Sequence, residues 1–205
     1  MAYEYDVFLS YNRKFPHGNW VNDVFFPLFE SYLADSLNVR KAKIFKDDRE
    51  IHSGTDWAKQ IRKGLVHSKA MVSIFSPAYF NSEWCMREFA TIYHRQLACG
   101  FLTDEAPDGL IVPLQLFDGQ HFPAFGNRHQ MLDCRDYNME GPAFKTTAQY
   151  IEFQRKLQKW VDDVAAAVNR APAWDASWIG QEWVEDAYNR LTLTKIADQT
   201  PPPTL

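Results

Sequence analysis

The sequence predicts an α/β protein in which an open parallel sheet of about five strands is covered by helices on both faces. Short apolar runs alternate with longer stretches of helical periodicity along most of the chain. This alternation is expected for parallel strands that are buried on both faces. With 205 residues, of which 46% are hydrophobic and 23% charged, the chain is long enough to form one domain around a real core.

The predicted strands lie at residues 6–10, 43–46, 71–75, 109–116 and 131–134. Between them, helical periodicity covers residues 20–36, a segment from Thr55 onward, a segment after residue 82, and residues 147–168. Pro27 interrupts the first of these segments, so we expect that helix to begin late or to kink. Strands that alternate with helices favour a flavodoxin-like sheet, with a helical extension at the C-terminus.

The helix that follows the third strand carries the most informative pattern. Its apolar residues recur at helical spacing and predict one buried stripe, made of Met86, Phe89, Ala90, Tyr93 and Leu97. Trp84 and Glu88 are four residues apart and point nearly opposite to that stripe. We therefore expect an aromatic ring and a carboxylate side by side on a face outside the core. The alternative is a tryptophan covered by a neighbouring loop beside a solvated carboxylate.

In an open parallel sheet, ligands bind beyond the carboxyl ends of the strands, where the strand order reverses. In a flavodoxin-like order the first and third strands flank that crevice. The first strand leads into Ser10, Tyr11 and Arg13, and Ser82 or Asn81 is a good N-cap for the helix that bears Glu88. We expect one pocket beside Glu88. Its lining would come from Ser10, Tyr11 and Arg13, from Trp84, from the loop at 47–54 and from Phe45 at the end of the second strand. Ordinary structural roles for Ser10, Tyr11 and Arg13 stay open.

Three segments in this order resemble the TIR (Toll/interleukin-1 receptor) domain family. They are the opening strand at residues 5–11, the strand and polar loop at residues 44–54, and the Trp-Cys-x-x-Glu sequence at residues 84–88. The resemblance covers roughly residues 3–168, and the third segment resembles the bacterial TIR domains that cleave NAD. It divides the chain into a TIR domain at 1–170 and a Trp-rich extension or linker at 171–205.

The resemblance implies an NAD glycohydrolase or cyclase with Glu88 as the catalytic residue, acting in bacterial immune (anti-phage) or stress signalling. Cleavage of the nicotinamide–ribose bond leaves positive charge on the ribose, which a carboxylate stabilises. Ser10, Tyr11, Arg13, Phe45 and Trp84 are then the candidate substrate-binding residues. Trp84 and Tyr11 would stack on a ring, and Arg13 would meet the pyrophosphate. NAD is a substrate here, and no cofactor or metal is expected.

Partners and location follow from composition and from the same resemblance. A net charge of −4 argues against nucleic acid, and no apolar stretch reaches the length of about 20 residues that spans a bilayer. The N-terminus enters a strand directly, and three cysteines without metal-like spacing suggest reduced thiols, so a cytoplasmic protein is expected. The loop at 47–54 mixes both charge signs with one apolar residue, Ile51. In the resembling family this loop contacts a neighbouring protomer.

Other functional classes fit less well. The chain has no glycine-rich dinucleotide or P-loop motif. It also lacks the acidic cluster and the aspartate at a strand end that a phospho-receiver domain needs. A non-catalytic TIR adaptor that only self-associates is the main alternative, and a nucleoside deoxyribosyltransferase-like enzyme is a third. The extension, with Trp174, Trp178 and Trp183, is expected to pack on the domain, with docking of another domain or subunit as its alternative.

Overall fold

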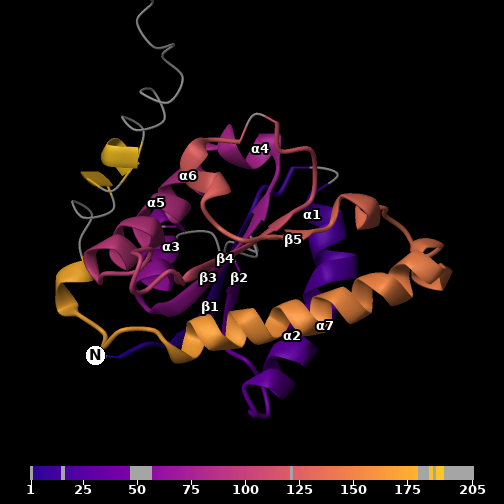
Figure 1. Cartoon of the computed structure of the whole chain (residues 1–205), viewed down its shortest axis with the longest axis horizontal. Coiled ribbons are helices and arrows are strands. Elements are labelled where there is room, and N and C mark those ends of the chain that lie inside the picture. The colour runs from indigo at the N-terminus through magenta and orange to yellow at the C-terminus, as the bar shows by residue number, and fades with distance from the viewer. Residues whose placement is uncertain are drawn as a thin grey trace, which may run out of the picture.

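A computed structural model of the chain shows a five-stranded parallel sheet between two layers of helices (Figure 1). The structure describes residues 2–14, 17–46, 57–120, 122–179, 185–186 and 188–191, and of Trp57 it describes the backbone alone. The predicted loop at 47–54, Trp183 and the terminal proline run at 201–203 therefore lie outside the described residues.

The strand order is β2-β1-β3-β4-β5, and every neighbouring pair is parallel. The strands are β1 (Tyr5–Tyr11), β2 (Ile44–Lys46), β3 (Ser68–Phe75), β4 (Ile111–Gln115) and β5 (Leu132–Asp133). This is the flavodoxin-like order, so the predicted fold class is confirmed. The chain turns from β2 back past β1 to β3, and the order therefore reverses beside the carboxyl ends of β1 and β3.

One face of the sheet is covered by α2 (Phe26–Ser36) and α7 (Ala148–Asn169), and the other by α3 (Trp57–Val66) and α5 (Glu83–Ala98) (Figure 1). Because side chains alternate along each strand, the sheet supplies two separate cores. Val7, Leu9 and Tyr11 point into the core under α2 and α7. Phe8 points into the core under α3 and α5.

The first helical segment contains an irregular turn next to Pro27. It consists of α1 (His17–Trp20), a π-helical turn η1 (Val21–Phe25) and α2. The backbone N–H of Phe26 donates to Val21 O, five residues back, so the extra residue is absorbed before the proline, which donates no hydrogen bond. The expected break is therefore a π-turn within a continuous helical segment.

Short elements complete the described part of the chain. They are α4 (Pro77–Phe80), α6 (Ala124–Asn127) and the 3-10 helices η2 (Arg135–Tyr137), η3 (Phe144–Thr146) and η4 (Ala176–Trp178). The helix predicted at 147–168 is confirmed as α7, with Thr147 as its N-cap.

The segment after α7 returns to the domain, as expected. Trp178 is buried, and the guanidinium of buried Arg95 lies 4.9 Å from its ring. The indole of Trp174 donates to Val66 O at 3.2 Å. Further along, residues 185–186 and 188–191 have helical backbone, and Leu191 is buried in the α3–α5 core. Whether residue 170 marks a domain boundary stays a prediction.

Candidate functional site

The candidate site lies at the carboxyl ends of β1 and β3, where α5 begins. The Ser82 side chain accepts from the Cys85 backbone N–H at 3.4 Å and caps the helix, which places Glu88 in its second turn. In β1 and β3, Ser10 and Ser73 are register partners, so both side chains point toward α5. The topological switch point and the start of α5 thus bring these polar groups together.

Glu88 anchors a buried chain of hydrogen bonds. The hydroxyl of Ser10 donates to Glu88 Oε2 at 2.6 Å, and Ser10 Oγ lies 2.9 Å from the hydroxyl of Tyr79. The Ser10 hydroxyl has a single proton, which it uses in the hydrogen bond to the carboxylate. Tyr79 is therefore the donor in the second bond. The Tyr79 oxygen is also 3.4 Å from Ser73 Oγ. These contacts hold the carboxylate in one orientation.

Burial governs the ionisation of the neighbouring groups. It raises the pKa of Tyr79 well above its ordinary value, and the charge of Glu88 acts in the same direction. Burial, with the same carboxylate, raises the pKa of the Cys85 thiol to about 12, although nearby Arg13 acts against this. Both groups therefore stay protonated at neutral pH, and Cys85 is a poor nucleophile.

The loop after β1 is fixed to α4. Asn12 Nδ2 donates to Ala78 O at 2.8 Å, and Asn12 Oδ1 accepts from the Lys14 backbone N–H at 2.9 Å. Gly18, at the start of α1, is required by this packing, because a Cβ there would lie 2.5 Å from Arg13 O. Arg13 is thereby held beside the site, partly exposed.

The structure corrects the predicted environment of Glu88. Its side chain is 6% exposed, whereas we expected it on a face outside the core. The reason is that α5 is buried on two sides, including at Thr91, Arg95 and Gln96. Leu97, which was expected in the buried stripe, is 43% exposed. Trp84 is 38% exposed, which agrees with its predicted position on a face outside the core.

Two of the predicted substrate-binding residues lie elsewhere. Tyr11 is buried under α2 and α7, on the face of the sheet opposite Ser10, so its expected place beside Glu88 is wrong. Phe45 lies on the same face as Ser10 but stacks on Phe8, with 5.1 Å between ring centroids. A Cβ on Gly64 would lie 2.7 Å from the Phe45 ring, so this ring fills the gap between β2 and α3. Its role in binding stays a prediction.

Sequence reasoning missed Tyr79 and Ser73 as members of the site. A signal for Ser73 was available, since it is a hydroxyl within the otherwise apolar run of β3. Tyr79 gave no such signal, because its position depends on the short helix α4 that Ser76 caps.

A family model of the TIR domain matches residues 7–147. The chain belongs to the TIR domain family. Glu88, Ser10 and Tyr79 all lie within the matched region of this TIR domain. Among the described residues there is no cluster of three or more metal-ligating side chains, and no helix long and apolar enough to cross a membrane.

Curated relatives match only part of this TIR chain. TMV resistance protein N of Nicotiana glutinosa is 29% identical over 90 residues, which are 44% of this chain and 7% of that protein. Disease resistance protein RPV1 of Vitis rotundifolia is 31% identical over 96 residues, 47% of this chain and 6% of that protein. The chain thus spans less than a tenth of the length of these relatives.

Solved structures of TIR domains were also matched. The TIR domain of the Toll-related receptor TRR-2 from Hydra magnipapillata aligns with a TM-score of 0.43 and 19% identity, over 75% of this chain and 98% of that one. The TIR domains of the activated Roq1 resistosome, which recognises the pathogen effector XopQ, align with a TM-score of 0.40 and 19% identity, over 92% and 98%.

Proposed function

We propose that this TIR domain is an NAD nucleosidase that cleaves the nicotinamide–ribose bond, releasing either ADP-ribose or a cyclised product. The observation that supports this proposal is the buried carboxylate of Glu88, held by Ser10 at 2.6 Å beside the switch point of the sheet. A carboxylate kept away from water stabilises an adjacent positive charge far more strongly than a solvated one.

The proposed reaction requires little beyond that charge. The C–N bond breaks, and both of its electrons leave with nicotinamide, which becomes neutral, so no general acid is needed. The ribose then carries the positive charge, which Glu88 stabilises while it binds a ribose hydroxyl. Water adds to the anomeric carbon and releases a proton, or a nucleophile within the substrate adds there and gives the cyclic product.

The other residues are assigned by position. Trp84 lies one helical turn before Glu88 and is exposed enough to stack on a substrate ring. Arg13 is the cation beside the site and suits a pyrophosphate. Tyr79 acts through Ser10 and positions the carboxylate, whereas Ser73 lies beside Tyr79 and supports the packing of this chain. We further propose a role in immune or stress signalling through TIR–TIR contacts, as the family membership favours.

The test is to incubate the purified protein with NAD and to identify the products by mass spectrometry, using wild type and Glu88→Gln. Glutamine keeps an acceptor for Ser10 but removes the charge. We expect nicotinamide release by wild type, no turnover by the variant and similar melting curves for both. Turnover by Glu88→Gln at the wild-type rate would refute the catalytic assignment. A wild type that is inactive even at high concentration would favour the adaptor alternative.

A further inference from the structure

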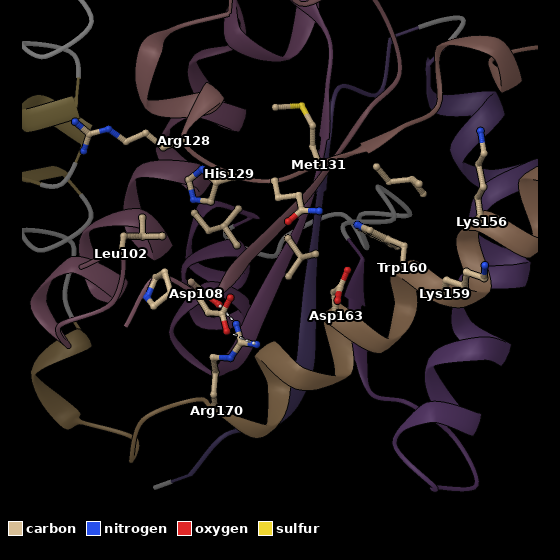
Figure 2. Close-up of a pocket in the computed structure, with 16 residues that line it drawn as sticks. Leu102, Asp108, Arg128, His129, Met131, Lys156, Lys159, Trp160, Asp163 and Arg170 are labelled. Carbon is tan, nitrogen blue, oxygen red and sulfur yellow. Dashed lines mark hydrogen bonds and ion pairs between the residues drawn. The ribbon is translucent and has the colours of Figure 1, made fainter. Parts of the chain in front are cut away.

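A cavity of about 600 Å³ lies far from Glu88, between the amino ends of β4 and β5 and helix α7 (Figure 2). Its walls include Ile111 and Val112 at the start of β4 and Leu132 at the start of β5. The Ser10–Glu88 pair lies at the carboxyl ends of the strands, so the two sites are at opposite ends of the strands. The volume is in the range that small-molecule ligands occupy.

The cavity carries positive charge on a chain that is negative overall. Four basic side chains and two carboxylates line it, whereas the whole chain has a net charge of −4. Arg170 pairs with Asp108 at 3.3 Å, and Lys156 pairs with Glu152 at 3.2 Å. For the other two basic side chains, Arg128 and Lys159, the described part of the chain provides no ion pair or hydrogen bond. They stand on opposite sides of the cavity (Figure 2), and both are exposed. The guanidinium of Arg128 points away from the cavity in that view, but each side chain is long enough to turn toward an anion.

A buried donor faces the same space. Trp160 is 6% exposed and packs on Phe25 and Phe29, but its indole nitrogen has no hydrogen-bond partner among the described residues. In Figure 2 this nitrogen points toward the interior of the cavity, but less than 1 Å² of it is accessible, so a ligand atom reaches it only when the covering side chains shift. A buried N–H without an acceptor is uncommon and costs free energy, which an acceptor atom of a ligand would recover.

The opposite wall is held rigid by a buried amide. Gln96 Oε1 accepts from the Leu110 backbone N–H at 2.8 Å, which orients the amide so that its nitrogen donates to His129 Nε2 at 3.2 Å. Burial lowers the pKa of His129 to about 4, so the imidazole is neutral at pH 7. Leu102, at the rim, has a φ of 60°, a left-handed conformation that leucine rarely adopts. This wall is therefore preorganised.

The lining combines exposed cations, apolar walls and a carboxylate, and one class of ligand would interact with all three. Exposed cations suit a phosphate, and apolar walls suit a flat ring. The carboxylate of Asp163, for which the described residues supply no partner, suits the hydroxyls of a ribose, as acidic residues do in dinucleotide sites. We infer that this cavity binds a nucleoside monophosphate, with its phosphate near Lys159, its ribose at Asp163 and an acceptor atom at the Trp160 indole.

The experiment is isothermal titration of the whole chain with AMP, 2′,3′-dideoxy-AMP, adenosine and inorganic phosphate. We expect AMP to bind at least tenfold more tightly than any of the other three. Lys159→Glu, on the exposed face of α7, should weaken AMP binding at least tenfold, and Asp163→Asn should abolish the preference for AMP over its dideoxy form. Trp160→Phe keeps the packing but removes the N–H and should also weaken binding.

Two controls keep the result specific to this cavity. Lys145→Glu reverses an equally exposed charge outside the lining and should leave AMP affinity unchanged. Glu88→Gln should also leave it unchanged, so the outcome is independent of NAD turnover. Equal affinities for AMP and inorganic phosphate, no binding of AMP, or AMP affinity that is the same in Lys159→Glu and wild type would each overturn the inference.

Discussion

Ser10 determines how Glu88 is oriented, because its hydroxyl is the donor to Oε2 and also accepts from Tyr79. Removing it takes one hydrogen bond from a buried carboxylate and one from a buried phenol, which costs about 1–3 kcal/mol of folding stability. For Ser10→Ala we also expect kcat for NAD cleavage to fall by about tenfold or more with a smaller change in KM, since orientation matters most in the transition state.

Ser73→Ala is the matched control. Ser73 is as buried as Ser10 and also lies beside the Tyr79 hydroxyl, but it is not bonded to Glu88. We expect it to lose stability while keeping kcat. Equal loss of kcat in both variants would mean that the whole hydroxyl chain, and not the Ser10 contact alone, orients the carboxylate. Initial rates and thermal melts on both proteins decide between the two.

Trp84 should matter for binding more than for stability. It is 38% exposed, so Trp84→Ala should change the free energy of unfolding by no more than about 1 kcal/mol while raising KM for NAD several-fold. Leu97→Ala truncates a similarly exposed apolar side chain on the same helix and should leave KM unchanged. A large drop in melting temperature for Trp84→Ala with unaltered KM would contradict the stacking role.

At the residue scale, the sequence placed Ser10 and Glu88 in one pocket, but it predicted neither their hydrogen bond nor their burial. It also placed Tyr11 on the wrong face of the sheet. Both faces of a parallel sheet are buried, so β1 is apolar on both and shows no alternation that tells which of two adjacent residues faces which core. The polar residues on the second buried face of α5 give no sign of burial in the sequence, because their partners come from other elements.

At the element scale, the contact between the C-terminal segment and α5 explains one of those polar residues. Arg95 is almost fully buried, donates to Ser68 O at 2.8 Å and has the Trp178 ring over its guanidinium. A buried guanidinium needs such partners, since burial alone lowers its pKa, here to about 10. The sequence predicted that this segment would pack on the domain, but the partner of Trp178 depends on tertiary structure.

We therefore expect Trp178→Ala to destabilise the domain by about 3–5 kcal/mol, in the range for truncating a buried tryptophan. Trp178→Phe keeps a ring over Arg95 and should recover part of the loss. Ile179→Ala, at an exposed neighbouring position, should have an effect within about 0.5 kcal/mol. Urea denaturation of the three variants measures this. If Trp178→Ala proved as stable as Ile179→Ala, the segment would be a loosely attached extension.

The burial of His129, which accepts from Gln96 of α5, should make the free energy of unfolding depend on pH. Burial lowers the pKa of His129 to about 4, whereas the unfolded chain has an ordinary histidine value near 6.5. The unfolded state therefore gains a proton first as pH falls, and stability is lost between about pH 6.5 and 4, by roughly 3 kcal/mol in total from this group.

His129→Gln removes the titration while keeping an acceptor for Gln96. Its stability should fall less steeply than that of wild type between pH 6.5 and 4, and the two curves should run parallel above pH 7. The comparison is made with urea midpoints, because other groups titrate equally in both proteins. Parallel curves over the whole range would show that His129 is protonated equally in the folded and unfolded states.

At the scale of the whole molecule, the parallel sheet was predictable while access to the site was not. The alternation of apolar runs and helices is a property of the chain and predicted a parallel sheet covered on both faces. The flavodoxin-like order 2-1-3-4-5 was a further expectation, which the structure confirms. How far Glu88 is covered depends on side chains from several elements that meet only after folding. The loop at 47–54, which the sequence assigned to protomer contacts, lies outside the described residues, so that assignment stays a prediction.

The last prediction is that NAD cleavage depends on assembly. In the single chain Glu88 is 6% exposed and Ser10 is 1% exposed, so the reacting carbon of a substrate reaches the carboxylate only if the covering side chains move. A contact with a second copy that favours the open arrangement would supply this by mass action, and specific activity would rise with protein concentration. Because the loop at 47–54 and its docking surface are different parts of the chain, the contact would be head-to-tail and would build open arrays.

Specific activity and sedimentation coefficient, measured over a hundredfold range of protein concentration, should rise together, and Ile51→Asp and Gly54→Pro should suppress both. Val39→Asp, which places the same charge at an exposed aliphatic position outside that loop, should suppress neither. Constant specific activity over that range, unchanged by either loop variant, would identify a monomeric enzyme whose site opens without a partner.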